Sequence, residues 1–450
     1  MAQSVAIVGA GASGTMLAVQ LLRRTGLRVT LIERGRAFGR GVAYGAAWDA
    51  HLLNVRSGRM SLTPERPADF TDWLAENSPD EADPDGFARR STYGRYLEAR
   101  LAEAERDAPG RLKRVTGEAV ALDAQGVRLA DGRTGSGDMV VLATGNLPPE
   151  PMRFRGAETL GERLIGDPWA PGALEAIGTD EDVLLIGTGL TAVDVLLALE
   201  SKGWRGRALA LSRRGLLPRS HEPHGHAVAG RRPETGRDVS QALRAFRAEA
   251  EADGWGEAME RVRPFVAELW RDADPAERAR FLRHLRPWWD VHRHRTAWHV
   301  GETVRRMLEH GRAEIAAGRL RSAEPENARV RVSWSPRGAA EPATGLFDRL
   351  VVCTGPAFDL QRTADPLLGG LFREGRARVD PLRLGLDVED DGRVRDAHGR
   401  PDPRLFAMGP LTRAAFWEIV AVPDIREQAL TLADRLGASA RRETENGATA

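Results

Sequence analysis

The sequence predicts an α/β protein that contains two parallel β-sheets. Short apolar runs with the length of buried strands alternate with segments of helical periodicity, and a strand, a glycine-rich turn and a helix follow one another twice. The chain has 450 residues, enough for two or three domains of ordinary size. In the first unit we expect strands at 4–8, 28–33 and 139–143, with a helix at 15–22 after the first of them.

The second unit begins with an expected strand at 183–186, a helix at 192–199 and a strand at 208–212. From about 239 to 319 the pattern turns helical, which we interpret as an insertion into this unit. Later expected elements are strands at 330–332 and 350–353. A short connecting segment that begins at Phe406 then leads to a helix at 425–436. The implied organisation is a discontinuous first domain at 1–150 and 345–437, a second domain at 151–344 that carries the helical insertion, and a disordered tail at 438–450.

The first glycine-rich turn, residues 9–14, lies between an expected strand and an expected helix. Gly9 permits the tight turn, Gly11 lets the backbone approach a diphosphate, and Gly14 lets the helix pack on the strand. The helix start, which includes Ser13, offers unpaired N–H groups and a positive dipole end. Glu33 ends the next strand, where a carboxylate accepts hydrogen bonds from a ribose. This spacing predicts a dinucleotide site.

The second turn, residues 187–192, repeats the arrangement with Ala192 at the third glycine position. The residues of this turn expected to contact a second dinucleotide are Gly187, Gly189, Leu190 and Thr191. The following strand ends in Ser212, Arg213 and Arg214, and no acid occupies the ribose position. Guanidinium groups suit a 2′-phosphate, so these residues favour NADPH over NADH. The sequence therefore predicts two nested Rossmann-type dinucleotide-binding domains, the second with a helical insertion.

Composition narrows the class of protein. The formal net charge is +1 at pH 7, which gives no electrostatic reason to expect nucleic acid or an anionic membrane as a partner. Cys353 is the only cysteine, so a redox-active cysteine pair is excluded and a reducing compartment is expected. No apolar run reaches the roughly 18 residues needed to span a bilayer. We therefore expect a cytoplasmic protein.

Longer strings of the sequence resemble known flavoproteins. Residues 143–146 and 353–355 look like the two crossings between the FAD and NADPH domains of flavin-containing monooxygenases and amino-acid N-hydroxylases. A closer resemblance is to a bacterial family of NAD(P)/FAD-binding proteins, whose signatures stand here at 41–44, 51–55 with Met60-Ser61, 285–295 and 416–426. This resemblance spans essentially the whole chain. It implies FAD in the first domain, NADPH in the second, and a small-molecule substrate and O2 as partners.

The resemblance also implies roles for individual residues. Asn54 matches the asparagine that lies against the flavin ring in flavin-containing monooxygenases, so it is the candidate catalytic residue. Trp417 belongs to a segment that closes over the ring in flavin enzymes. The further cofactor-binding residues that we expect are Arg34, Tyr44, Met60, Thr144, Gly145 and Gly409.

The chain departs from the flavin monooxygenase pattern at two places. Phe154 and Gly156 match the motif F-x-G-x-x-x-H that precedes the second loop in many of these enzymes, but Leu160 stands at the histidine position. Gly409 is followed by Pro410, where the final FAD segment usually has an acid. The first departure bears on monooxygenase chemistry, and the second bears only on the details of flavin contact.

The leading hypothesis is an FAD-dependent, NADPH-using monooxygenase that transfers oxygen from a flavin C4a-hydroperoxide to a small nucleophile such as an amine. The second is an NAD(P)H-dependent flavin oxidoreductase without oxygen transfer, which Leu160 favours. The third is a flavin-binding regulatory protein without turnover. His292, His294 and His299 lie close together in the sequence but follow no metal-ligand motif, so we expect no metal site.

Overall fold

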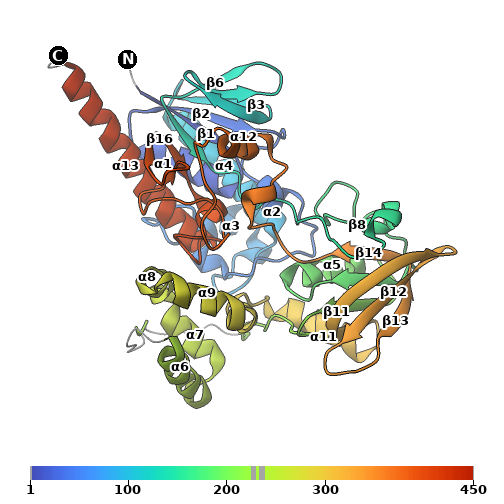
Figure 1. Cartoon of the computed structure of the whole chain (residues 1–450). Helices are drawn as coiled ribbons and strands as arrows, with labels where there is room; N and C mark the ends of the chain where they lie inside the picture. Colours follow the sequence, from blue (N-terminus) through green and yellow to red (C-terminus); the bar gives the residue numbers. More distant parts are fainter. Residues whose placement is uncertain (1–2, 224–229, 233–238, 449–450) are drawn as a thin grey trace.

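The computed structural model describes residues 3–223, 230–232 and 239–448, which form two Rossmann-type domains and a helical lobe (Figure 1). The first domain contains a six-stranded sheet in the order β15-β16-β7-β1-β2-β3, in which only the pair β15–β16 is antiparallel. The bounds of these strands are β1 Ser4–Val8, β2 Arg28–Glu33, β3 Leu112–Thr116, β7 Met139–Leu142, β15 Arg393–Arg395 and β16 Pro401–Ala407.

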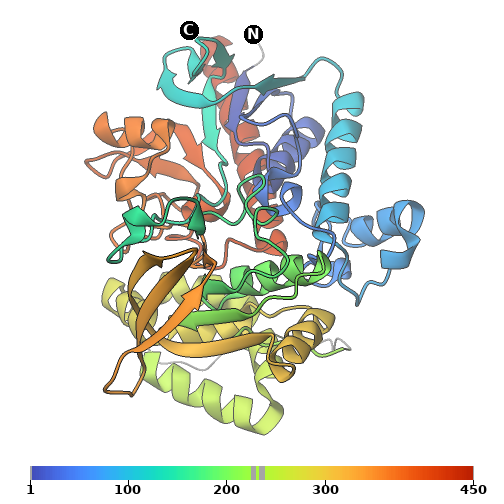
Figure 2. The same ribbon diagram turned by 90° about the vertical axis from the view of Figure 1, so that its right-hand side faces the viewer.

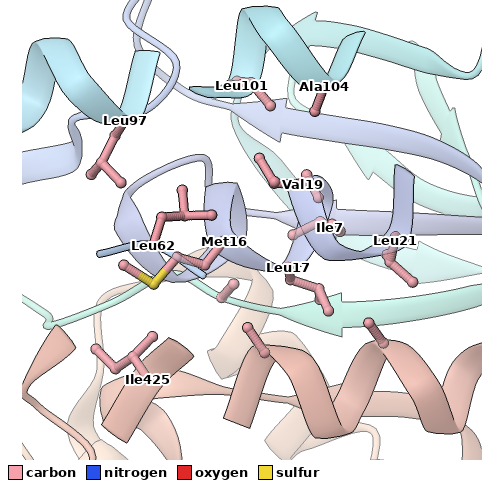
Figure 3. Packing of buried hydrophobic residues seen from close by; sticks show 14 of the residues in the cluster. Ile7, Met16, Leu17, Val19, Leu21, Leu62, Leu97, Leu101, Ala104 and Ile425 are labelled. Atoms are coloured by element: carbon pink, nitrogen blue, oxygen red, sulfur yellow. The ribbon is translucent and has the colours of Figure 1, made fainter. Parts of the chain in front are cut away.

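Helices cover one face of this sheet. They are α1 Ala12–Arg24, α4 Arg90–Asp107 and α13 Val422–Ala448. Figure 3 shows the apolar side chains of α1 packed between those of α4 and α13, with Ile7 of β1 next to them. Two shorter helices, α2 Gly41–Gly45 and α3 Asp69–Asn77, lie in the long connection between β2 and α4.

A second, smaller layer covers the opposite face of the first sheet. It consists of an antiparallel sheet of β4 Ala119–Asp123, β5 Gly126–Leu129 and β6 Thr134–Ser136, together with α12 Pro366–Arg373. Side chains of these elements share a buried cluster with Ala6, Val8 and Ile32 of the first sheet. The first domain is therefore built from an N-terminal part and a C-terminal part of the chain, with the second domain inserted between them.

The second domain contains a seven-stranded sheet in the order β13-β12-β11-β10-β9-β14-β8. The bounds are β8 Leu164–Ile165, β9 Val183–Ile186, β10 Ala208–Ser212, β11 Ala313–Glu326, β12 Arg329–Pro336, β13 Ala343–Phe347 and β14 Arg349–Val352. The strands β11, β10, β9, β14 and β8 are parallel to one another. β12 and β13 extend the sheet as an antiparallel meander. α5 Leu190–Ser201 and α11 Trp298–Glu309 share one core beside this sheet. Figure 2 shows α5, in green, on the side of the second domain that faces the first domain.

The helical insertion is shorter than predicted. It comprises α6 Val239–Asp253, α7 Trp255–Val262, α8 Val266–Asp272, α9 Pro275–His284 and α10 Arg286–Arg293. α11 packs against α5 and thus belongs to the second domain, and residues 313–319 are the start of β11 rather than helix. The predicted end at 319 is therefore wrong.

Two predicted boundaries also change. β14 pairs with β9 inside the second sheet, so the chain returns to the first domain after β14 and not at 345. The tail predicted to be disordered from 438 is helical to Ala448, because α13 continues through it. Within the described ranges, no helix is both long and apolar enough to cross a membrane.

Candidate functional site

The first glycine loop requires glycine at two positions for steric reasons. Gly9 has a φ of +101°, and a Cβ added to it would lie 2.4 Å from the carbonyl oxygen of Ala143. A Cβ on Gly14 would lie 1.9 Å from the carbonyl oxygen of Gly9. Any side chain at these positions would push the loop away from β7 or from α1. The tight turn and the close helix packing that we predicted are both present.

The start of α1 is suited to an anion. Gly11 is its N-cap, no side chain caps the helix, and the first turn contains no acidic residue. The first N–H groups of a helix have no partner within it and carry its positive dipole end. Ser13 is buried in this first turn. The carboxylate of Glu33 lies at the same loop, where it accepts hydrogen bonds from the N–H groups of Ala10 at 2.8 Å and Gly35 at 3.2 Å.

Two further segments converge on this loop. Gly409 has a φ of +68°, and a Cβ on it would lie 2.5 Å from Oγ of Ser13. The N–H of Gly409 donates to Oε1 of Gln428 at 2.7 Å. Thr144 follows β7, and its Oγ1 is buried without a hydrogen-bond partner, next to Gly145 at a φ of +72°. An orphaned hydroxyl beside an uncapped helix start fits the diphosphate of FAD.

The other first-domain residues predicted to bind FAD lie in different environments. Arg34 is exposed just after β2. Tyr44 packs edge-on against Tyr93, with ring centroids 4.8 Å apart, and burial raises the pKa of Tyr44 to about 12. Met60 is 2% exposed, and its side chain lies in the core of the first domain. A flavin contact at Met60 would therefore come from its backbone.

Asn54 lies where the first domain meets a segment of the second. Its carbonyl oxygen is 3.1 Å from Nε2 of His221, whose ring packs on Phe87 with centroids 5.2 Å apart. Burial lowers the pKa of His221 to about 3, so the ring is neutral and Nε2 is the donor. This contact fixes the backbone of Asn54 and leaves its amide group available to a ligand.

The second glycine loop has the geometry of the first. Gly187 has a φ of +124°, and a Cβ on it would lie 2.3 Å from the carbonyl oxygen of Cys353, at the end of the neighbouring strand. Gly189 is the N-cap of α5, which has no side-chain cap and no acid in the first turn that contains Leu190 and Thr191. A Cβ on Gly189 would meet nothing within 4 Å. The open space and the free helix start fit a second diphosphate.

The residues predicted to select NADPH divide into two kinds. Ser212 holds the loop itself, because its Oγ is 2.8 Å from Oγ1 of Thr188 and accepts a hydrogen bond from the N–H of Gly215 at 3.0 Å. Arg213 is exposed and Arg214 is partly buried. Neither guanidinium has an ion-pair partner in the described part of the chain, so both remain free for a phosphate.

Trp417 does not line an open cavity. It is 2% exposed, and its ring stacks on Trp270 with centroids 4.7 Å apart. The guanidinium of Arg413 lies 4.5 Å from the same ring, and Phe281 packs edge-on against it at 5.5 Å. In the structure Trp417 belongs to the core between the helical insertion and the segment after β16, and its flavin contact stays a prediction.

The three neighbouring histidines are not brought together. His292 stacks on Trp255 with centroids 4.2 Å apart, and Nε2 of His294 lies 3.7 Å from Asp290. His299 lies on α11. No group of three or more side chains that could hold a metal ion occurs among the residues that the structure describes.

The sequence did not reveal a buried ionic contact that joins the two domains. Arg90, at the start of α4, donates to both carboxylate oxygens of Asp194 on α5, at 2.7 and 3.0 Å. His51 is fully buried, and its Nδ1 accepts from the N–H of Trp48 at 3.1 Å, so Nε2 carries the proton and donates to the carbonyl oxygen of Asp194 at 2.9 Å. Burial lowers the pKa of His51. The sequence signal was an acid within an otherwise apolar helix.

Leu160, which replaces the motif histidine, has a structural role. It is 2% exposed and packs with Ile186 and Val352 in a core of the second domain. A cavity of about 720 Å³ lies nearby and includes Phe154 and Glu158 in its lining. A histidine at 160 would be buried in apolar surroundings, so this departure changes packing rather than removing a group from an open site.

Residues 6–147 match the model of a protein family described as FAD-NAD(P)-binding. The match covers less than half of the 450-residue chain. The matched segment contains the first glycine loop, Glu33, Asn54 and Thr144. A curated relative, the nitrosuccinate-forming L-aspartate N-monooxygenase of Streptomyces cremeus, is 31% identical over 144 residues. These residues are 30% of this chain and 21% of that protein, so the match spans about a fifth of the relative's length.

Solved structures share the fold of nearly the whole chain. An ornithine N-hydroxylase from Kutzneria sp. 744, described with reduced FAD, NADP+ and L-ornithine, is 17% identical with a TM-score of 0.66, covering 99% of this chain and 100% of that one. A thioredoxin reductase from Lactococcus lactis is 14% identical with a TM-score of 0.54, covering 97% and 99%. The predicted fold of two-dinucleotide-binding flavoproteins is thus confirmed.

Proposed function

We propose that this chain is an FAD-dependent, NADPH-using monooxygenase that hydroxylates the nitrogen of a small amine. The observation that carries the proposal is the pair of glycine loops, each followed by a helix start without a side-chain cap, within a fold shared end to end with an ornithine N-hydroxylase. The relative from Streptomyces cremeus, named as an aspartate N-monooxygenase, supports the same kind of reaction.

The thioredoxin reductase fold offers a different chemistry, which the cysteine count excludes. Exchange of a disulfide needs a second sulfur atom, and Cys353 is the only cysteine in the sequence. Cys353 is 3% exposed, and burial raises the pKa of its thiol well above the usual range, so it stays protonated. Electrons from NADPH therefore do not pass to a disulfide of this chain.

The overall reaction balances as R–NH2 + O2 + NADPH + H+ giving R–NHOH + NADP+ + H2O. When bound, FAD accepts hydride from NADPH and activates O2 for transfer of one oxygen atom to the amine. The chain positions the reactants: the start of α1 and the Thr144 hydroxyl hold the diphosphate of FAD, and the start of α5 holds that of NADPH. Arg213 and Arg214 would bind the 2′-phosphate of NADPH, and the amide of Asn54 would be the polar group that contacts the flavin.

A flavin oxidoreductase that passes electrons to another acceptor is the second candidate, and Leu160 at the motif histidine position is the observation that favours it. A flavin-binding regulatory protein without turnover is the third. One experiment separates the three. The holoprotein is supplied with NADPH and a panel of small amines, and NADPH, hydroxylamine product and hydrogen peroxide are all quantified.

We expect at least one amine to give close to one hydroxylamine per NADPH with little peroxide. If every amine leaves the electrons in peroxide or in an added artificial acceptor, the chain is a reductase. If NADPH does not reduce the bound flavin, the chain is a binding protein and the proposal fails.

Replacement of Asn54 tests its assignment. Asn54→Ala is expected to keep its FAD and its rate of NADPH oxidation but to give about tenfold less hydroxylamine per NADPH, because a lost polar contact worth about 1.4 kcal/mol lets peroxide escape. Product and peroxide yields measure this split. Asn77→Ala, at the end of α3, is the matched control and should retain the wild-type yield. An unchanged yield in Asn54→Ala would remove Asn54 from the site.

A further inference from the structure

Arg413 is a buried cation without a counter-ion. It follows Gly409 by one turn and is 5% exposed. Its Nε is buried and has no hydrogen-bond partner. Among the side chains that the structure describes, in residues 3–223, 230–232 and 241–441, no carboxylate lies within ion-pair distance of its guanidinium. A charged group removed from water is unfavourable unless it is paired, so this environment is incomplete as it stands.

Two aromatic rings hold the guanidinium of Arg413 in place. Its central carbon lies 4.5 Å from the ring centres of both Phe358 and Trp417. Arg286, on α10 of the helical insertion, approaches the same two rings at 5.3 and 5.9 Å. Contacts with aromatic faces offset only part of the loss of hydration. They also leave the N–H edge of a guanidinium available for a planar anion.

Two nearby carboxylates are paired with other arginines. Asp290 lies 3.4 Å from Nε of Arg286, and Glu418 lies 2.8 Å from Nε of Arg293 and accepts from Trp289 at 2.9 Å. Asp424 is a third buried carboxylate beside Arg293, and burial raises its pKa. Burial lowers the pKa of His294. Of Arg286, Arg293 and Arg413, only Arg413 has no carboxylate partner within ion-pair distance among the described side chains.

The cluster borders the predicted flavin site. Phe358 lines a narrow cleft together with Gly145 and Pro410, which adjoin Thr144 and Gly409 of the FAD loop region. The cleft holds only about 10 Å³ in this structure, so an anion must displace a side chain to enter. Arg286 is the movable member, because its side chain is 29% exposed.

We propose that Arg413 and Arg286 bind the carboxylate of the substrate, which makes the substrate an amino acid rather than a simple amine. The inference rests on the proposed N-hydroxylation. An unpaired buried guanidinium calls for an anion, and the planar carboxylate fits the edge of a guanidinium held between two rings. A phosphate of a bound cofactor is the other source of anionic oxygen, and the test distinguishes it.

The test measures binding to the oxidised holoprotein without NADPH and therefore without turnover. Succinate, L-aspartate, propylamine and inorganic phosphate are titrated, and the change in the flavin absorption spectrum and in the thermal midpoint is followed. We expect saturable responses to succinate and L-aspartate, and at least tenfold weaker responses to propylamine and phosphate. Arg413→Gln and the more exposed Arg286→Gln should each weaken carboxylate binding at least tenfold.

A second readout separates a ligand site from a structural role. Arg413→Gln should unfold at the wild-type temperature or above it when no ligand is present, because it removes an unpaired buried charge. The matched control Arg293→Gln breaks the pair with Glu418 and should unfold at a lower temperature. Loss of stability in Arg413→Gln equal to that in Arg293→Gln would overturn the proposal.

The outcomes also separate this inference from the proposed function. Carboxylate binding that depends on Arg413, without hydroxylation of any amine, keeps the site and rejects the N-hydroxylation. Hydroxylation of amines that lack a carboxylate, at equal efficiency in wild type and Arg413→Gln, keeps the reaction and rejects the site. Tighter binding of phosphate than of succinate also rejects it and assigns the cation to a cofactor.

Discussion

At the scale of single residues, one methyl group is expected to decide whether the first loop holds FAD. In Gly14→Ala the new Cβ would lie 1.9 Å from the carbonyl oxygen of Gly9, so the loop and α1 must separate. Overpacking of this kind costs about 1–3 kcal/mol, and more where backbone must move. We expect the variant to purify with little FAD and with a lowered thermal midpoint, as measured by flavin absorbance per protein and by thermal unfolding.

The second loop provides the control for this prediction. Ala192 occupies the position equivalent to Gly14 and is buried at the start of α5. Ala192→Gly removes a methyl group, weakens the helix by about 1 kcal/mol and should leave the flavin content unchanged. Full retention of FAD by Gly14→Ala would show that the steric argument is wrong.

The choice of nicotinamide cofactor is a second property of single residues. Arg213 and Arg214 have no ion-pair partner in the described ranges, so replacing Arg213 by serine breaks no internal contact. Loss of a charged hydrogen bond to phosphate is worth about 1.5–3 kcal/mol. We expect the KM for NADPH in flavin reduction to rise roughly 10- to 100-fold in Arg213→Ser, with little change for NADH. Arg306→Ser on α11 should match wild type, and an unchanged NADPH KM in Arg213→Ser would contradict the assignment.

At the scale of elements, α4 and α5 are held together by the buried pair of Arg90 and Asp194, whose side chains are 15% and 9% exposed. Arg90→Met leaves the Asp194 carboxylate buried without its partner. Breaking such a pair costs about 3–5 kcal/mol. We expect a matching loss of stability in denaturant unfolding followed by helical circular dichroism and flavin release.

The double variant Arg90→Met with Asp194→Leu should recover most of this loss, because it removes both charges. Arg205→Ser is the control: its ion pair with Asp180 is exposed at 69% and 66%, and its loss should leave the stability close to that of wild type. Equal effects of Arg90→Met and Arg205→Ser would show that the buried pair does not join the domains.

The elements differ in how far they were predictable from sequence. The strands at 4–8, 28–33, 183–186 and 208–212 coincide with β1, β2, β9 and β10, because buried parallel strands are continuous apolar runs with clear ends. β11, Ala313–Glu326, is rich in alanine, arginine and glutamate, which favour helix locally. Its pairing with β10 and β12 overrides that preference, and the sequence of β11 alone does not indicate which strands it pairs with.

The candidate site was also only partly predictable from the sequence. Both glycine loops were predictable because their function depends on spacing within six residues. The contacts of Arg90 with Asp194 and of Trp270 with Ala414 join residues 104 and 144 positions apart, and only the fold brings them together. The core environment of Trp417 was not predictable for the same reason, since its stacking partner Trp270 lies in the insertion.

At the scale of the whole molecule, neutral buried histidines lie where parts of the chain meet. His51 reaches Asp194 of the second domain, and His221 reaches Asn54 of the first. Burial lowers the pKa of both, and that of His221 falls to about 3. Each histidine stays unprotonated in the folded chain at pH values where the unfolded chain takes up a proton.

Stability is therefore expected to fall in acid. Below pH 6.5 the unfolded state binds more protons than the folded state, so the stability that is fully present above that pH is lost progressively as the pH falls toward 3. His221 alone contributes roughly 2 kcal/mol to the loss between pH 6.5 and pH 5. Thermal midpoints from pH 7.5 to 5.0 should drop less in His221→Gln, whose amide still donates to the Asn54 carbonyl but does not titrate. His310→Gln, at an exposed position, should follow the wild-type curve. Identical pH slopes for wild type and His221→Gln would show that protonation of His221 does not cause the loss of stability in acid.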